Sequence, residues 1–175
     1  GDRMVLQQAP AVASVWGFNA VDGAVSVALD GSTAGVTVSV GPAGRWEAHL
    51  PPTTGSPSGV THTVSATLSS HVDNTTARIS ISGVLFGEVW VCSGQSNMVR
   101  QVNWANASVE EMAAAKNYPD IRIFMVDRID GSHTALPDFL SVAQPWAAPG
   151  DRNSTDVDPA VAQFAATCWY FGRDM

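Results

Sequence analysis

The chain has 175 residues, 45% of them hydrophobic and 14% charged, so it can bury an apolar core and is not a disordered tail. Its formal net charge of −7 argues against partners such as nucleic acid or an anionic membrane. No apolar run approaches the length of a transmembrane helix.

The first half of the chain is predicted to be a set of short β-strands. Hydrophobic and polar residues alternate with a period of two, and Gly, Pro, Asp and Ser separate the alternating segments. Several short strands at this spacing favour a small all-β, sandwich-like domain, which we place at residues 1–83. The expected strands cover residues 13–17, 24–29, 36–40, 46–50, 62–68 and 77–81.

A second pattern, of α/β type, begins at residue 84 and is predicted to open another domain over residues 84–175. Residues 84–86 and 88–92 form a nearly continuous apolar run, which is typical of a strand buried on both faces of a parallel sheet. A strand is also expected at 121–126. Strands that alternate with helices indicate the opening of an α/β sheet.

Two helices are predicted in this second half. Ser108 and Glu111 have the spacing of a capping box, which predicts a helix that runs to Lys116. Asp158 and Pro159 form a good helix start, and the apolar segment 160–171 follows them. Between the helices, residues 127–158 are rich in Pro, Gly, Asp and Ser and are expected to be a long surface excursion.

Cys92 and Cys168 are the only cysteines. Both lie in apolar segments, so we expect buried free thiols. Metal-ligand spacing is absent, and no metal or cofactor is expected. Three sequons for N-glycosylation favour a secreted or lysosomal protein; their acceptors are Asn74, Asn106 and Asn153.

Ser96 is the candidate nucleophile, because it follows an apolar run at a Gly94-Gln95-Ser96-Asn97 turn. A serine at such a turn resembles a nucleophile elbow, although Met98 stands where that motif has its second glycine. The Ser96 amide is also a candidate oxyanion donor. The alternative is that Ser96 only caps a helix, and residue types alone favour that alternative.

A catalytic base for Ser96 is not evident. His49, His62 and His71 lie in or beside the expected strands and are interpreted as solvated or packed. Asp130 and His133 have a D-x-x-H spacing, but they lie in the surface excursion and are not expected to supply the base. Of the tryptophans, Trp104 follows the serine and could border a sugar pocket, although packing in the core is the preferred interpretation.

Three segments together resemble the sialate O-acetylesterase family of the SGNH hydrolases. Residues 2–8 with 15–17 are similar to the family's amino-terminal opening, and residues 165–173 to a helix of its hydrolase domain. Residues 84–98, VLFGEVWVCSGQSNM, resemble the nucleophile block nearly residue for residue. This similarity reverses the preference for a helix cap at Ser96.

The resemblance implies a serine esterase that removes acetyl groups from sugar hydroxyls, typically on sialic acid, through an acetyl-serine intermediate. It implies an SGNH-type three-layer hydrolase domain, with Ser96 as nucleophile and Gln95 and Asn97 beside the substrate. The family's other oxyanion donors, a Gly and an Asn, and its His–Asp pair come from later blocks. We therefore expect the chain to be the amino-terminal part of a longer enzyme, inactive and poorly soluble when isolated.

Two alternatives remain open at this level. A related acetylxylan-type esterase would use the same serine chemistry on a plant polysaccharide. A non-catalytic carbohydrate-binding protein would use exposed aromatic residues of the β-rich first half.

Overall fold

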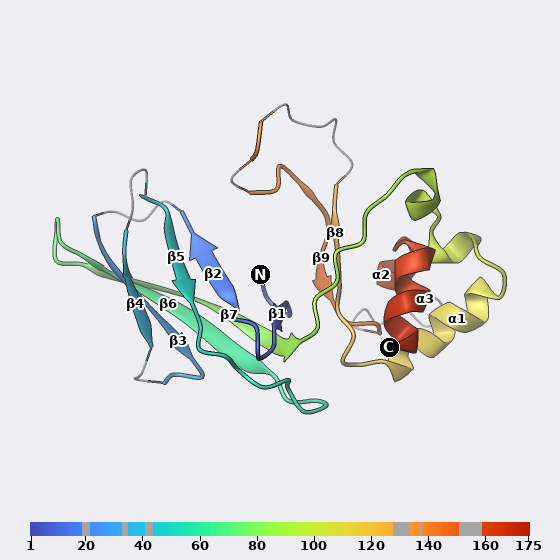
Figure 1. Cartoon of the computed structure of the whole chain (residues 1–175), viewed down its shortest axis with the longest axis horizontal. Coiled ribbons are helices and arrows are strands. Elements are labelled where there is room, and N and C mark those ends of the chain that lie inside the picture. The colour runs from blue at the N-terminus through green and yellow to red at the C-terminus, as the bar shows by residue number, and fades with distance from the viewer. Residues whose placement is uncertain (19–21, 33–34, 41–43, 128–133, 137, 151–158) are drawn as a thin grey trace. The chain divides into compact units, whose positions relative to one another are not determined.

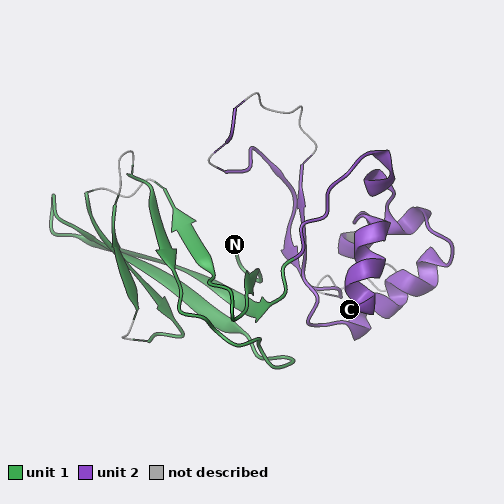
Figure 2. Cartoon of the chain, in the orientation of Figure 1, with its two compact units in different colours: residues 1–89 green, residues 90–175 purple. Residues whose placement is uncertain are grey.

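The structure is a computed structural model of the chain, and it divides into two compact units, Gly1–Val89 and Trp90–Met175 (Figures 1 and 2). The residues that the structure describes are 1–18, 22–32, 35–40, 44–127, 134–136, 138–150 and 159–175.

Unit 1 is built from strands. A five-stranded sheet has the order β1-β7-β6-β3-β4, and β2 and β5 form a separate antiparallel pair. Within the large sheet only the β1–β7 pairing is parallel. The six strands expected from the alternating pattern are confirmed, and β1 is an addition to them. The bounds are β1 Val5–Gln7, β2 Ser14–Gly17, β3 Gly23–Leu29, β4 Val36–Ser39, β5 Trp46–His49, β6 His62–Ser70 and β7 Thr76–Gly87.

The alternating pattern places one set of side chains in a shared apolar core. On β3, Val25 and Val27 are buried while the residues between them are only partly covered. The same core cluster takes Val15 from β2 and Ala48 from β5, so the two-stranded pair packs against the five-stranded sheet. Burial of this apolar surface is what stabilises the unit.

The apolar run at residues 84–92 does not form the strand that the sequence predicts. Its first part, through Gly87, continues β7 and pairs in parallel with β1, with Val5 opposite Leu85. Val84 and Phe86 are buried in the core of unit 1. Residues 88–94 have no regular secondary structure, and Val91 is 91% exposed. Only the first part of the apolar run is therefore a strand, and the rest is irregular chain.

Unit 2 contains short helices and one two-stranded antiparallel sheet, β8–β9. The strand expected at 121–126 is confirmed as β8. Its partner β9 lies in the segment that the sequence predicted to be a surface excursion, and no parallel sheet occurs among the described residues of this unit. The bounds are η2 Ser96–Val99, η3 Val102–Trp104, α1 Ser108–Ala114, η4 Ala115–Asn117, β8 Ile123–Val126, β9 Val142–Ala147, α2 Pro159–Ala162 and α3 Ala166–Asp174.

The helix predicted at 160–171 is two helices with a break between them. Pro159 begins α2 as expected, while Asp158 lies outside the described residues. At the break, the Phe164 carbonyl accepts a hydrogen bond from the Val102 amide at 3.0 Å, and the Ala166 amide donates to the Arg100 carbonyl at 2.8 Å. These long-range bonds use backbone groups that a continuous helix would pair internally, so the helix is interrupted there.

The predicted helix at Ser108 is confirmed, but its capping box is wrong. The residue that precedes α1 is Ala107, in the left-handed conformation (φ 56°), and no side chain caps the helix. Glu111 instead turns to α3, where it accepts hydrogen bonds from Trp169 Nε1 and from Arg173, both at 2.6 Å. A carboxylate that serves a tertiary contact is not available to the helix end.

A polar clamp joins β3 to β6 in unit 1. One Asp30 carboxylate oxygen lies 2.7 Å from His62 Nδ1, and the other accepts the Thr63 amide at 2.8 Å. Because a carboxylate only accepts, the His62 nitrogen is the donor. The hydrogen bond from His62, followed by that from the Thr63 amide, lowers the pKa of Asp30 below its ordinary value.

We expect Asp30→Asn to lower the free energy of unfolding at pH 7 by less than about 1 kcal/mol, because the pair is solvent-exposed. Asn tolerates the left-handed backbone of this residue (φ 49°), so the change tests the charge. The folded-state pKa is lowered, so the ionised Asp30 stabilises the fold above its ordinary pKa, and this contribution is lost as the pH falls through the folded-state value. Thermal unfolding of the parent and of Asp30→Asn at pH 7 and at about pH 3 measures this contribution, and Asp22→Asn is the control. If the stability difference between the parent and Asp30→Asn were the same at both pH values, this account would be contradicted.

Candidate active site

Ser96 begins a single turn of 3-10 helix, η2. The preceding residue Gln95 is extended (φ −84°, ψ −158°) and occupies the N-cap position without a side-chain capping bond. The Met98 amide donates to the Gln95 carbonyl at 2.9 Å and closes the turn. A Cβ on Gly94 would lie 2.8 Å from Met98 Cγ, so glycine lets Met98 pack over the turn. Ser96 is therefore not the helix cap that residue types alone favoured.

The polar groups of Ser96 are available to a ligand. Its side chain is exposed. Among the residues that the structure describes, none hydrogen-bonds the Ser96 hydroxyl or accepts from its amide. The amide lies at the first position of a helical turn, where no intrahelical acceptor exists. Chemically, this arrangement offers a nucleophilic oxygen and a backbone donor at one residue.

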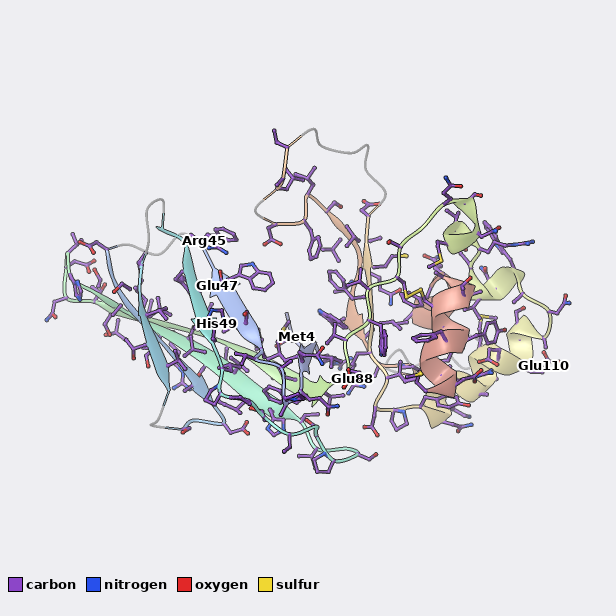
Figure 3. All side chains as sticks on the ribbon, viewed as in Figure 1. Met4, Arg45, Glu47, His49, Glu88 and Glu110 are labelled. Atoms are coloured by element: carbon purple, nitrogen blue, oxygen red, sulfur yellow. A yellow bond between two sulfur atoms is a disulfide. The ribbon has the colours of Figure 1, made fainter. Side chains whose placement is uncertain are left out.

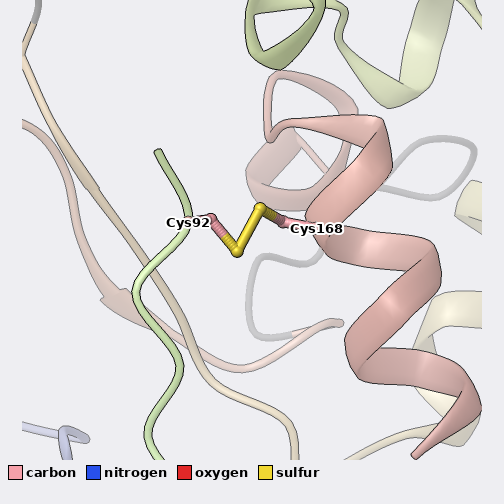
Figure 4. Close-up of a disulfide and its surroundings, with 2 residues drawn as sticks. All are labelled: Cys92 and Cys168. Atoms are coloured by element: carbon pink, nitrogen blue, oxygen red, sulfur yellow. A yellow bond between two sulfur atoms is a disulfide. The ribbon is translucent and has the colours of Figure 1, made fainter. Parts of the chain in front are cut away.

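A disulfide joins the segment before Ser96 to helix α3. Cys92 and Cys168 are bonded (Figure 4), with their Cα atoms 6.2 Å apart and a sequence separation of 76. The prediction of two buried free thiols was wrong. The pairing depends on a tertiary contact that sequence spacing does not reveal, although the sequons indicated a compartment in which disulfides form.

The segment after Ser96 is held by backbone hydrogen bonds to the residues that precede α3. Gln101 forms an isolated antiparallel bridge with Ala165, flanked by the bonds of Val102 with Phe164 and of Arg100 with Ala166. The Ser96 turn thus lies between a covalent link on one side and a short backbone ladder on the other. Sequence analysis identified neither link.

Helix α3 itself is fixed by aromatic and ionic contacts. Phe171 contacts Trp90 edge-on, with ring centroids 5.1 Å apart, and Trp169 contacts Tyr118 in the same way at 6.1 Å. The hydrogen bonds that Arg173 donates to the carboxylates of Asp174 and Glu111 raise the pKa of its guanidinium above the ordinary value. These contacts tie α3 to α1 and to the chain that leads to Ser96.

The structure places the described histidines in unit 1. His49 on β5 lies 2.8 Å from the Ser14 hydroxyl (Figure 3), and His62 is engaged by Asp30. The His71 amide donates to the Asp22 carbonyl at the end of β6. Within the described part of unit 2 there is no histidine to serve Ser96, and Asp130 and His133 lie outside the described residues.

The residues around Ser96 present polar and aromatic groups to solvent. Gln95 and Asn97 are exposed on either side of the serine. Trp104, on η3, is 60% exposed, so the preferred interpretation of packing in the core was wrong.

Of the sequon acceptors, Asn74 and Asn106 are exposed and Asn153 lies outside the described residues.

The described residues contain no cluster of His, Cys, Asp or Glu that could hold a metal ion. None of the described helices has the length and apolar character that a membrane span requires.

Comparison with solved structures finds a similar fold in a carbohydrate acetylesterase. The crystal structure of such an enzyme from Xanthomonas citri matches 99% of this chain with a TM-score of 0.79 and 24% sequence identity, over 35% of its own length. This likeness agrees with the α/β class expected from the sequence.

Comparison with curated proteins identifies the family that the chain resembles. It is 34% identical to sialate O-acetylesterase of Mus musculus and 31% identical to that of Rattus norvegicus, in each case over 97% of this chain. It is 30% identical to the Homo sapiens protein over 98% of this chain. The chain spans about a third of the length of these relatives (31% or 32%). No family model matches the chain. The predicted resemblance to the sialate O-acetylesterases is thereby confirmed.

Proposed function

We propose that the protein containing this chain is a serine esterase that removes O-acetyl groups from sugars, with sialic acids as its substrates. One observation carries the proposal: Ser96 presents an exposed hydroxyl and an unpaired amide among the described residues, on a turn held at both sides. The names of the curated relatives, sialate O-acetylesterase, support the substrate class.

In the proposed reaction, Ser96 Oγ attacks the carbonyl carbon of the acetyl ester while a base takes the hydroxyl proton. The sugar oxygen leaves and receives a proton, and an acetyl-serine remains. Water then attacks this ester and releases acetate. The Ser96 amide donates to the developing oxyanion, and Gln95 and Asn97 contact the substrate. The base and its carboxylate partner are supplied from outside the described residues.

The finer features of the architecture belong to the same proposal. Unit 2 would contribute the opening elements of a three-layer SGNH hydrolase domain, and unit 1 would be a separate sandwich-like module. Asn74 and Asn106, both exposed, would carry glycans in a secreted or lysosomal protein.

Acetate release separates the substrate classes. The longest natural protein that contains residues 1–175 is assayed with O-acetylated sialic acid and with acetylated xylan, beside the isolated chain 1–175. We expect a kcat/KM at least about tenfold higher on the sialic acid ester, which corresponds to a difference of about 1.4 kcal/mol in transition-state stabilisation. We expect no activity from the isolated chain, because the described part of unit 2 has no histidine that could act as the base for Ser96. Preference for acetylated xylan would support an acetylxylan-type esterase instead.

A carbohydrate-binding function is the second candidate, favoured by two exposed aromatic side chains. Trp16 on β2 is 47% exposed and Trp104 is 60% exposed, and such rings can cover the apolar face of a sugar. Glycan binding by residues 1–89, which keep β7 whole, together with no esterase activity in the natural protein, would favour this candidate.

A further inference from the structure

The Ser96 turn has little structure of its own to fix its position. Residues 88–94 carry no regular secondary structure, and η2 is a single turn. Inside the turn, the recorded backbone hydrogen bonds are local, from Met98 to Gln95 and from Arg100 to Asn97. The position of the serine therefore depends on contacts outside the turn, among them the links on either side.

The two links, a disulfide and a set of backbone hydrogen bonds, both end within residues 164–168. Cys92, four residues before Ser96, is bonded to Cys168 in the first turn of α3. Arg100, four residues after Ser96, accepts the Ala166 amide at 2.8 Å, and the neighbouring ladder reaches Phe164. Residues 164–168 thus hold the chain symmetrically about the serine.

These residues are a suitable reference because they lead into helix α3, which is packed against α1. Cys168 and Trp169 are buried, with Trp169 only 1% exposed. Glu111 holds the Trp169 ring nitrogen and the Arg173 side chain from α1. A side chain placed by a packed helix can be more precise than one on an unsupported loop.

We propose that the Cys92–Cys168 disulfide and the ladder of residues 100–102 with 164–166 form a positioning device for the Ser96 hydroxyl. The cysteines and Ala166 are positioning residues, since they act through the backbone of the turn and need not touch substrate. This inference rests on the proposed function. A displacement of about 1 Å at a reacting atom can lower a rate by about 10²-fold, so loss of either link reduces kcat rather than substrate binding.

The test uses the natural protein with the double variant Cys92→Ala/Cys168→Ala, which leaves no free thiol from the pair. The readouts are kcat and KM for an acetylated sugar, the thermal midpoint, and the rate at which a fluorophosphonate labels Ser96. At a temperature where the variant is folded, we expect kcat and labelling to fall about 10- to 100-fold, with KM within about threefold of the parent. Met112→Ala, at a buried residue of α1, is the matched control. It destabilises the same unit but removes neither the disulfide nor a hydrogen bond of the ladder, so kcat should stay near the parent value.

A second variant tests the other link and does not depend on the disulfide. Ala166 is the first residue of α3, and Ala165 before it is extended (φ −63°, ψ 119°), so proline fits the helix start. Ala166→Pro removes the amide that donates to Arg100, and kcat should fall with KM little changed. If the double variant does not fold, Ala166→Pro decides the question.

The outcomes separate this inference from the proposed function. Normal kcat in either folded variant, while Ser96→Ala is inactive, would overturn the positioning device and leave the esterase intact. If the unmodified protein has no esterase activity, the proposed function fails and the inference fails with it. A fall in kcat as large in Met112→Ala as in the double variant would also overturn it.

Discussion

Replacement of Ser96 by alanine in the natural protein should abolish acetyl-ester hydrolysis, with a fall in kcat of about 10³- to 10⁶-fold. The change removes the oxygen that forms the acetyl-enzyme, and no other group of the turn replaces it. Stability should hardly change, because the side chain is exposed and makes no recorded hydrogen bond among the described residues. Initial rates of acetate release and the thermal midpoint measure both expectations.

Ser93→Ala is the matched control for this experiment. Ser93 is an exposed serine three residues before Ser96, in the irregular segment 88–94. Loss of the Ser93 hydroxyl should leave kcat within about threefold of the parent value. Such a change corresponds to less than about 1 kcal/mol in the activation free energy. Substantial hydrolysis by the Ser96→Ala protein would show that a different residue is the nucleophile.

The largest expected effect on stability is at Trp169, the most buried large side chain of unit 2. Trp169→Ala should lower the free energy of unfolding by about 3–5 kcal/mol, because it leaves a large cavity. It also removes the ring that contacts Tyr118 and the donor to Glu111. Trp169→Phe keeps most of the apolar contact but loses the N–H donor. We expect this variant to lower the free energy of unfolding by about 1–3 kcal/mol.

Hydrogen exchange resolved by segment is the suitable measurement, since the chain has two compact units. Protection should fall in α1 and α3 for Trp169→Ala and remain unchanged in β3 and β6. Trp104→Ala is the control, because that ring is 60% exposed and its loss should cost less than about 0.5 kcal/mol. Protection in α1 and α3 equal to that of the parent would contradict the assignment of Trp169 to the core.

The strands of unit 1 were predictable because hydrophobic and polar residues alternate within each strand, over only a few consecutive residues. On β3, Val25 and Val27 face the core and their neighbours do not, so the period of two is written directly in the sequence. The same local reasoning located the turn at Ser96, where a glycine follows an apolar run. Local patterns are informative when burial alternates within one element.

The misjudged elements share a dependence on distant partners. Glu111 has the spacing of a capping residue, but its carboxylate accepts hydrogen bonds from Trp169 and Arg173 and does not cap the helix. The apolar run at 84–92 looks uniform, but β1 covers only its first part. In both cases the local signal was present, and a tertiary contact determined how the residues were used.

The sequence by itself determined the alternating strands, the site of the Ser96 turn and the resemblance to the sialate O-acetylesterases. The tertiary structure alone decided the disulfide between Cys92 and Cys168, the break between α2 and α3, and the support of the Ser96 turn by residues 164–168. The physical reason is sequence separation. An alternating strand or a tight turn follows from preferences of neighbouring residues, whereas a bond across 76 residues exists only once the fold has brought its two ends together.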